Sequence, residues 1–144
     1  MKLLFLDVDG VLNSHDFFDY AGKFAQTDLG MIDGRAVDLL KVICDRTLAD
    51  IVLTSTRKTP RSSFDIVANR LAEKKIGILK STDSNGPTRG DEIKRCLNEL
   101  SKQFHIDSWC IVDDDGDMLL EQMKNFVQTR MAFGLTGMVA QRII

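Results

Sequence analysis

Short apolar runs alternate with longer amphipathic stretches along this chain of 144 residues. Each apolar run is short and bounded by polar or turn-forming residues, which is typical of buried strands in a parallel sheet. The pattern predicts strands over Lys2–Val8, Asp50–Leu53, Lys75–Leu79, Ser108–Val112 and Asn125–Thr129.

The stretches between these runs carry apolar residues at helical spacing. A helix over Ala36–Leu48 is expected to be capped by Asp33, and Ser62 is expected to cap a second helix. The clearest helical signal follows Thr88, because Thr88 and Asp91 have the spacing of a capping box and apolar residues then recur at helical period.

The remaining elements complete an alternating order of strands and helices. Short helices are expected after Asp117 and near Gly137–Ile144, and Lys80–Pro87 is rich in turn-forming residues and predicts a surface loop. The order predicts an α/β fold, a three-layer sandwich with a doubly wound parallel sheet and helices on both faces. Residues 1–144 are expected to form one domain.

The composition is that of a soluble globular protein, with 44% hydrophobic and 28% charged residues. The net charge of −2 and the lack of a long basic run argue against an extended nucleic-acid footprint. Cys44, Cys96 and Cys110 lie scattered in apolar segments and predict core residues in a reducing compartment. Because no segment is typical of a signal peptide or a membrane span, a cytoplasmic protein with no membrane partner is expected.

Polar side chains gather where the predicted strands end. Asp7 and Asp9 close the first strand, Thr54–Arg57 follow the second, Arg89 opens the helix after Thr88, and an acidic run at 113–117 follows the fourth strand. A carboxylate at the end of a buried strand is costly to desolvate unless a metal or partner compensates its charge. Ligands in open α/β sheets bind beyond these strand ends, so the four segments predict one site.

In this order, the four segments resemble the four motifs of the haloacid dehalogenase (HAD) superfamily, over essentially the whole chain. The resemblance implies a phosphatase that uses Mg²⁺ and forms an aspartyl-phosphate. It makes Asp7 the nucleophile and Asp9 the general acid and base. The metal residues that it implies are Asp7, Asp9, Asp113 and Asp114, with the Val8 carbonyl as a further oxygen ligand.

The same resemblance implies that Thr54 or Ser55 binds phosphate oxygens together with Arg89. Thr54 directly follows the apolar strand, but both hydroxyls also suit a simple turn. The charge of Arg89 is unfavourable to the dipole of the helix that it opens, which favours a role in anion binding; Lys94 is the alternative cation. Asp117 is either a supporting acid or a solvated loop residue, and which acid of 113–117 contacts the metal directly stays open.

The segments where related phosphatases insert a cap are short. Asn13–Asp33 has room for a loop and a hairpin, and Lys58–Thr88 is taken up by one helix, one strand and a loop. The sequence therefore predicts a minimal cap or none. An open site admits the end of a polymer more readily than it encloses a small metabolite.

The motifs Leu6–Asn13, Leu53–Arg57, Arg89–Ile93 and Val112–Asp115 are similar to those of HAD modules of nucleic-acid end repair, such as the phosphatase half of polynucleotide kinase-phosphatases. This likeness implies a phosphomonoesterase for nucleotides or polynucleotide ends, 3′-phosphates among them. Arg57 and Lys58, with Arg61, then form a basic rim for the substrate, or simply an exposed loop. Thr56 replaces a tryptophan that is frequent in these relatives.

Three alternatives remain at this stage. One is a HAD phosphatase of small metabolites, and another is a HAD-like module that binds phosphate without hydrolysing it. The third is a receiver domain, which also binds Mg²⁺ and is phosphorylated on aspartate. A receiver domain carries a lysine after its fifth strand, where this chain has Arg130. No obligate protein partner is evident.

Overall fold

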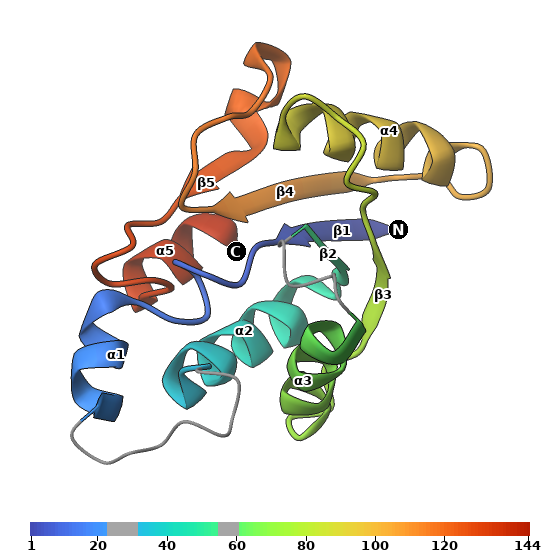
Figure 1. The fold of residues 1–144 in the computed structure, drawn as a ribbon. Coiled ribbons are helices and arrows are strands. Elements are labelled where there is room, and N and C mark those ends of the chain that lie inside the picture. Colours follow the sequence, from blue (N-terminus) through green and yellow to red (C-terminus); the bar gives the residue numbers. More distant parts are fainter. Residues whose placement is uncertain (23–31, 55–60) are drawn as a thin grey trace.

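A computed structural model describes residues 1–22, 32–54 and 61–144 of the chain. Helices and strands alternate along these residues (Figure 1). Their bounds are β1 (Lys2–Leu6), α1 (His15–Gly22), α2 (Gly34–Thr47), β2 (Asp50–Leu53), α3 (Arg61–Ala72), β3 (Ile78–Ser81), α4 (Arg89–Ser101), β4 (Ser108–Asp113), the 3₁₀ helix η2 (Leu120–Asn125), β5 (Phe126–Gln128) and α5 (Gly137–Ile143).

The strands of the described chain form one parallel sheet in the order β3-β2-β1-β4-β5. The chain winds outward from β1 to β3 and then crosses back to β4, so the strand order reverses between β1 and β4. Loops diverge at such a switch point and leave a crevice at the carboxyl ends of the strands. The doubly wound fold is confirmed, and its order differs from the 2-1-3-4-5 order of receiver domains.

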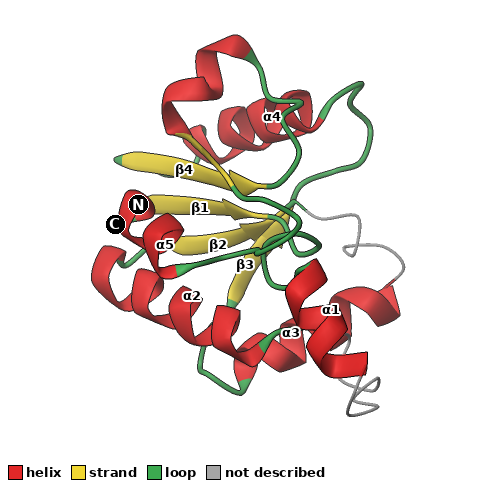
Figure 2. Cartoon of the chain, turned by 90° about the vertical axis from the view of Figure 1, so that its left-hand side faces the viewer, coloured by secondary structure: helices red, strands yellow, loops and turns green. Residues whose placement is uncertain are grey.

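Two apolar layers flank the sheet, as the three-layer prediction requires (Figure 2). On one face, α2, α3 and α5 pack against alternate strand residues such as Leu4, Leu6 and Ile51. On the other face, α4 covers Phe5 and its neighbours. Because successive strand side chains point to opposite faces, almost every residue of β1 is buried.

Two of the predicted helix caps are confirmed. The Asp33 carboxylate accepts a hydrogen bond from the Arg35 backbone N–H at 2.9 Å, and the Thr88 hydroxyl accepts one from that of Asp91 at 3.2 Å. The prediction for Ser62 is wrong, because α3 already begins at Arg61 and Ser62 lies inside its first turn.

The predicted third strand is shifted along the chain. Lys75 adopts a left-handed conformation with φ of 59°, and the N–H groups of Lys75 and Ile76 still bond back to the end of α3. The backbone becomes extended only at Ile78, so β3 runs to Ser81 and takes in two residues that were predicted to belong to the loop. The first strand also ends earlier than predicted, at Leu6, because the backbone turns beyond Asp7.

Part of the segment expected to form a loop and a hairpin is the helix α1. Ser14 starts it, since its hydroxyl accepts a hydrogen bond from the Phe17 backbone N–H at 3.1 Å. Apart from this helix, the described residues add little to the sheet and its flanking layers, in agreement with the prediction of a minimal cap. None of the helices in the described part combines the length and apolar character that a bilayer crossing requires.

Candidate active site

Carboxylates from two neighbouring strands meet at the switch point of the sheet. Asp7 follows β1, Asp113 ends β4 and Asp114 comes next in the chain. Each offers one carboxylate oxygen, and these oxygens all lie within 4.8 Å of one another. They face an open pocket of about 400 Å³ that is lined by Asp7, Asp9, Arg89, Asp113, Asp114, Asp115 and Met131.

Backbone hydrogen bonds between strands hold this cluster in place. The Asp7 N–H donates to the Val112 carbonyl at 3.1 Å, and the Thr129 N–H donates to the Asp113 carbonyl at 3.0 Å. The Asp113 carboxylate is fully buried, and its Oδ1 accepts from the Asp115 N–H at 2.9 Å. Sheet register therefore brings together acids that are more than a hundred residues apart in sequence.

Arg89 neutralises part of this negative charge. Its Nη1 atom donates to Asp7 Oδ1 at 3.0 Å and to Asp113 Oδ2 at 2.9 Å. The side chain is 16% exposed, and its other guanidinium nitrogens make no hydrogen bond with any described residue. The structure thus brings Arg89 to the site predicted for it, where it lines the pocket and keeps donors that the described acids do not use.

The buried acids are electrostatically strained. Burial raises the pKa of Asp113 to about 8, with the nearby charge of Asp7 adding to the effect and Arg89 opposing it. Burial also raises the pKa of Asp7, against the pull of Arg89. A divalent cation would relieve this cost, and three carboxylates that line an open pocket offer the oxygen ligands that suit Mg²⁺. The residues present therefore fit the predicted metal.

The raised pKa of Asp113 predicts how the metal-free protein responds to pH. Between the ordinary carboxyl pKa of about 4 and the native value of about 8, the folded chain holds a proton that the unfolded chain has lost. The free energy of unfolding should therefore fall as pH rises through this window and level off above it. Chemical denaturation in EDTA at several pH values measures this slope.

The variant Asp113→Asn should make that slope much shallower, because the amide does not titrate. Asp45→Asn is the matched control, since Asp45 is an exposed acid on α2. An unchanged slope in Asp113→Asn would contradict the assignment of the proton to Asp113.

Asp9 sits apart from the three clustered acids, in the turn that follows β1. Its Oδ1 accepts a hydrogen bond from Asn13 Nδ2 at 2.8 Å, and Asn13 Oδ1 accepts from the Gly10 N–H at 2.9 Å. The Thr129 hydroxyl donates to the Gly10 carbonyl at 2.6 Å. Asp9 lines the pocket, but among the described residues it is not part of the candidate metal group.

Thr54 lies beside Asp7 on the neighbouring strand end. Its N–H donates to the Leu6 carbonyl at 2.9 Å, and its side chain is almost fully buried. The hydroxyl oxygen finds no hydrogen-bond partner in the described part of the chain. A buried hydroxyl without a partner is costly, which is a feature of sites that receive a polar ligand. Ser55, Arg57 and Lys58 lie outside the described residues.

Asp117 contacts the backbone of Arg89 and, among the described residues, is not part of the group of three acids. Its carboxylate accepts from the Arg89 backbone N–H at 3.1 Å, so it caps the first turn of α4 and fixes the start of the Arg89 side chain. Lys94 points elsewhere, since its ammonium group pairs with Glu121 at 2.9 Å. Gln122, which sequence reasoning missed, donates to the Gly90 carbonyl at 2.8 Å and ties η2 to the same turn.

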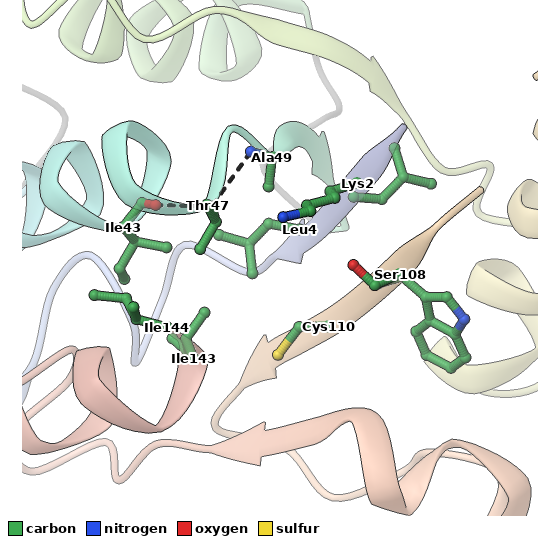
Figure 3. A pocket seen from close by; sticks show the side chains of 11 residues that line it. Lys2, Leu4, Ile43, Thr47, Ala49, Ser108, Cys110, Ile143 and Ile144 are labelled. Atoms are coloured by element: carbon green, nitrogen blue, oxygen red, sulfur yellow. Dashed lines mark hydrogen bonds between the residues drawn. The ribbon is translucent and has the colours of Figure 1, made fainter. Parts of the chain in front are cut away.

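A second pocket, of about 210 Å³, lies at the opposite end of β1 and β4, against the ends of α2 and α5 (Figure 3). Most of its described lining residues have apolar side chains, and none of them has a carboxylate side chain. The Thr47 hydroxyl there is satisfied, because it donates to the Ile43 carbonyl at 2.7 Å and accepts from the Ala49 N–H at 3.2 Å. Among the described residues, the group of acids that could hold a metal therefore lies at the carboxyl edge of the sheet, away from this pocket.

The switch-point fold and the acidic pocket together define a protein of the HAD type. A family model described as the HAD domain in Swiss Army Knife RNA repair proteins matches residues 3–140, so the chain belongs to that family. No curated protein and no solved structure matches the chain. The resemblance inferred from the four motifs is confirmed, and the family supports a HAD phosphatase.

Proposed function

We propose that this protein is a Mg²⁺-dependent phosphomonoesterase that acts on nucleotides or on the phosphorylated ends of a polynucleotide. The observation that carries the proposal is the cluster of Asp7, Asp113 and Asp114 at the switch point of the sheet, where Arg89 bridges Asp7 and Asp113. Phosphoryl transfer depends mainly on positioning and charge neutralisation, and this pocket is built from those two elements.

Asp7 is the proposed nucleophile. One of its carboxylate oxygens attacks phosphorus, the bond from phosphorus to the substrate oxygen breaks, and Asp9 gives that leaving oxygen its proton. Asp9 then takes a proton from water as the water attacks the aspartyl-phosphate, which releases inorganic phosphate and restores Asp7. When bound, Mg²⁺ neutralises charge between the carboxylates and the phosphate, and Asp7, Asp113 and Asp114 would hold it.

Arg89 and Thr54 are the proposed phosphate ligands. The guanidinium nitrogens of Arg89 that are not used on the acids provide donors of fixed charge at the first turn of α4. The Thr54 hydroxyl provides a buried donor beside Asp7. Ser55 stays a predicted phosphate ligand, and Arg57 and Lys58 stay predicted substrate-binding residues on the segment that follows.

Thr54→Val separates this role from a structural one. The substitution keeps the shape and removes a hydroxyl that has no partner in the described chain, so the free energy of unfolding should stay the same or rise by about 1 kcal/mol. The kcat/KM for phosphomonoesters should fall about 10-fold to 100-fold, because one donor to the phosphate is lost. Thermal unfolding and steady-state phosphate release measure the two effects.

Thr47→Val is the matched control at the other end of the sheet. Thr47 loses satisfied hydrogen bonds when its hydroxyl is removed, so stability should fall while kcat/KM is unchanged. The same pattern in Thr54→Val would show that Thr54 is only structural.

The family description and the open pocket support a nucleic-acid end as the substrate. The matched family is described as the HAD domain of RNA repair proteins, which supports a nucleic acid as the substrate. The pocket is open to solvent beside Met131, and the described residues carry little that would close over a small molecule. An oligonucleotide end can therefore reach the acids while the rest of the strand stays outside.

A substrate panel tests the proposal. Phosphate release is measured from 3′-phosphorylated and 5′-phosphorylated RNA and DNA oligonucleotides, nucleoside monophosphates and sugar phosphates, with Mg²⁺ and with EDTA. We expect turnover that requires Mg²⁺, prefers an oligonucleotide end and weakens with salt. Equal activity on sugar phosphates would favour a small-metabolite phosphatase. The absence of Mg²⁺-dependent turnover on every substrate would overturn the proposed function.

A further inference from the structure

The turn between β1 and α1 contains a buried amide that the proposed mechanism does not yet use. Asn13 is only 1% exposed, and its side chain lies between the Gly10 backbone and the carboxylate of Asp9. An asparagine is rarely buried unless its amide is hydrogen-bonded at both ends. Here the two bonds measure 2.9 and 2.8 Å, and both partners belong to the motif that carries Asp7 and Asp9.

The orientation of this amide follows from the chemistry of its neighbours. The Gly10 N–H can only donate, so the Asn13 atom that faces it at 2.9 Å must be the carbonyl oxygen Oδ1. The NH₂ group must then face Asp9, where it donates to Oδ1 at 2.8 Å. One backbone N–H thus decides which end of the amide meets the acid.

We propose that Asn13 is a positioning residue that orients Asp9 as the proton donor to the leaving group. The inference depends on the proposed function. The unprotonated oxygen of a carboxylic acid is the better acceptor, so a donor fixed at Oδ1 favours placing the acid proton on Oδ2. Because the hydrogen bond also fixes the carboxyl plane, the proton-bearing oxygen keeps one direction relative to Asp7.

The turn is held from a second side, which provides a control. The Thr129 hydroxyl, from the end of β5, donates to the Gly10 carbonyl at 2.6 Å. Thr129 therefore supports the same turn, and among the described residues its hydrogen bonds go to the Gly10 and Asp113 carbonyls and not to the Asp9 carboxylate. Loss of the Thr129 hydroxyl should make the whole turn more mobile. Loss of the Asn13 amide should in addition remove the hydrogen bond that orients the Asp9 carboxyl group.

The test uses the dependence of the rate on the leaving group. A 4-nitrophenolate leaves without needing a proton, whereas an alkoxide leaves only with one. The kcat/KM reports the first chemical step, so it is measured with Mg²⁺ for 4-nitrophenyl phosphate, phenyl phosphate and a simple alkyl phosphate. Asn13→Asp keeps the acceptor for the Gly10 N–H but removes the amide donor, and Asn13→Ala removes both contacts. Thermal unfolding reports whether each variant is folded.

For both Asn13 variants, we expect kcat/KM to fall about 30-fold to 100-fold on the alkyl ester and less than about 3-fold on the nitrophenyl ester. Asp9→Asn should show the same selectivity with a larger loss, and Thr129→Val should lower both substrates equally. If Asn13 variants lose activity equally on all esters while Asp9→Asn is selective, Asn13 is only structural. If Asp9→Asn itself shows no selectivity, the proposed role of Asp9 fails instead.

Discussion

The variant Asp7→Asn is expected to lose at least about 10⁴-fold in kcat while remaining folded. An amide oxygen in place of the carboxylate is a poor nucleophile, and every other group in the pocket keeps its place. The fold should tolerate the change, because burial already raises the pKa of Asp7 and a neutral side chain of the same shape avoids that cost. Arg89 retains its contact with Asp113 at 2.9 Å.

Steady-state phosphate release from the best substrate of the panel measures the loss, and thermal unfolding in EDTA checks the fold. Asp50→Asn is the matched control: Asp50 is an exposed acid of the same sheet, at the start of β2 and so at the edge away from the pocket. Its activity should stay within about 2-fold of the wild type. Near-normal turnover by a clean preparation of Asp7→Asn would rule out Asp7 as the nucleophile.

The convergence of the acids could be predicted from the sequence because it depends on few rules. Once the apolar runs are assigned as parallel strands, their carboxyl ends lie at one edge, so Asp7 and Asp113 must approach each other. The cap of α4 is local in sequence, and it puts Arg89 at the first turn, facing the same edge. The pattern of apolar residues and the spacing of the helix cap were therefore sufficient to place Asp7, Asp113 and Arg89 at one edge.

The residues that support the site through hydrogen bonds could not be predicted in the same way, because their partners are not set by the spacing of residues in the sequence. Thr129 reaches Gly10 across 119 positions, and Gln122 reaches Gly90 across 32. Both bonds join a side chain to a backbone carbonyl, and any polar residue at such a position would look like a loop residue in the sequence. Asn13 is closer to its partners, and an asparagine three residues after a glycine in a turn was a usable signal.

Element boundaries were missed for a different reason. The end of α3 depends on Lys75 adopting a left-handed conformation, which a lysine rarely does and which its sequence neighbourhood does not predict. The start of α1 depends on Ser14, a good capping residue within a segment where the sequence predicts a loop and a hairpin. Neither error moves the candidate site, because the acids follow β1 and β4, whose carboxyl ends are fixed by pairing with each other.

The variant Gly10→Ala is expected to damage both the fold and the proposed metal site. Gly10 has φ of +83°, and a Cβ atom there would lie 2.4 Å from Cγ of Asp114. The left-handed conformation costs an alanine about 1–2 kcal/mol, and relief of the overlap requires Asp114 to move. We expect a loss of about 2–4 kcal/mol in the free energy of unfolding, and a Mg²⁺ requirement raised about 10-fold or more.

Gly137→Ala is the matched control, because a Cβ atom at Gly137 meets nothing within 4 Å. It should leave the Mg²⁺ requirement unchanged and leave stability equal or slightly higher.

Asp114→Ala separates the two costs at Gly10, which are the backbone strain and the overlap with the Asp114 side chain. It removes the two closest atoms that the new Cβ would meet, so adding Gly10→Ala to it should cost less stability than adding the same change to the wild type. Equal costs in both backgrounds would mean that backbone strain, together with the remaining contact of 2.8 Å to the Cβ atom of Asp114 that alanine keeps, requires glycine. A smaller cost beside Asp114→Ala would mean that glycine is also needed to let the carboxylate of Asp114, a proposed metal ligand, pack against the turn that carries Asp7 and Asp9.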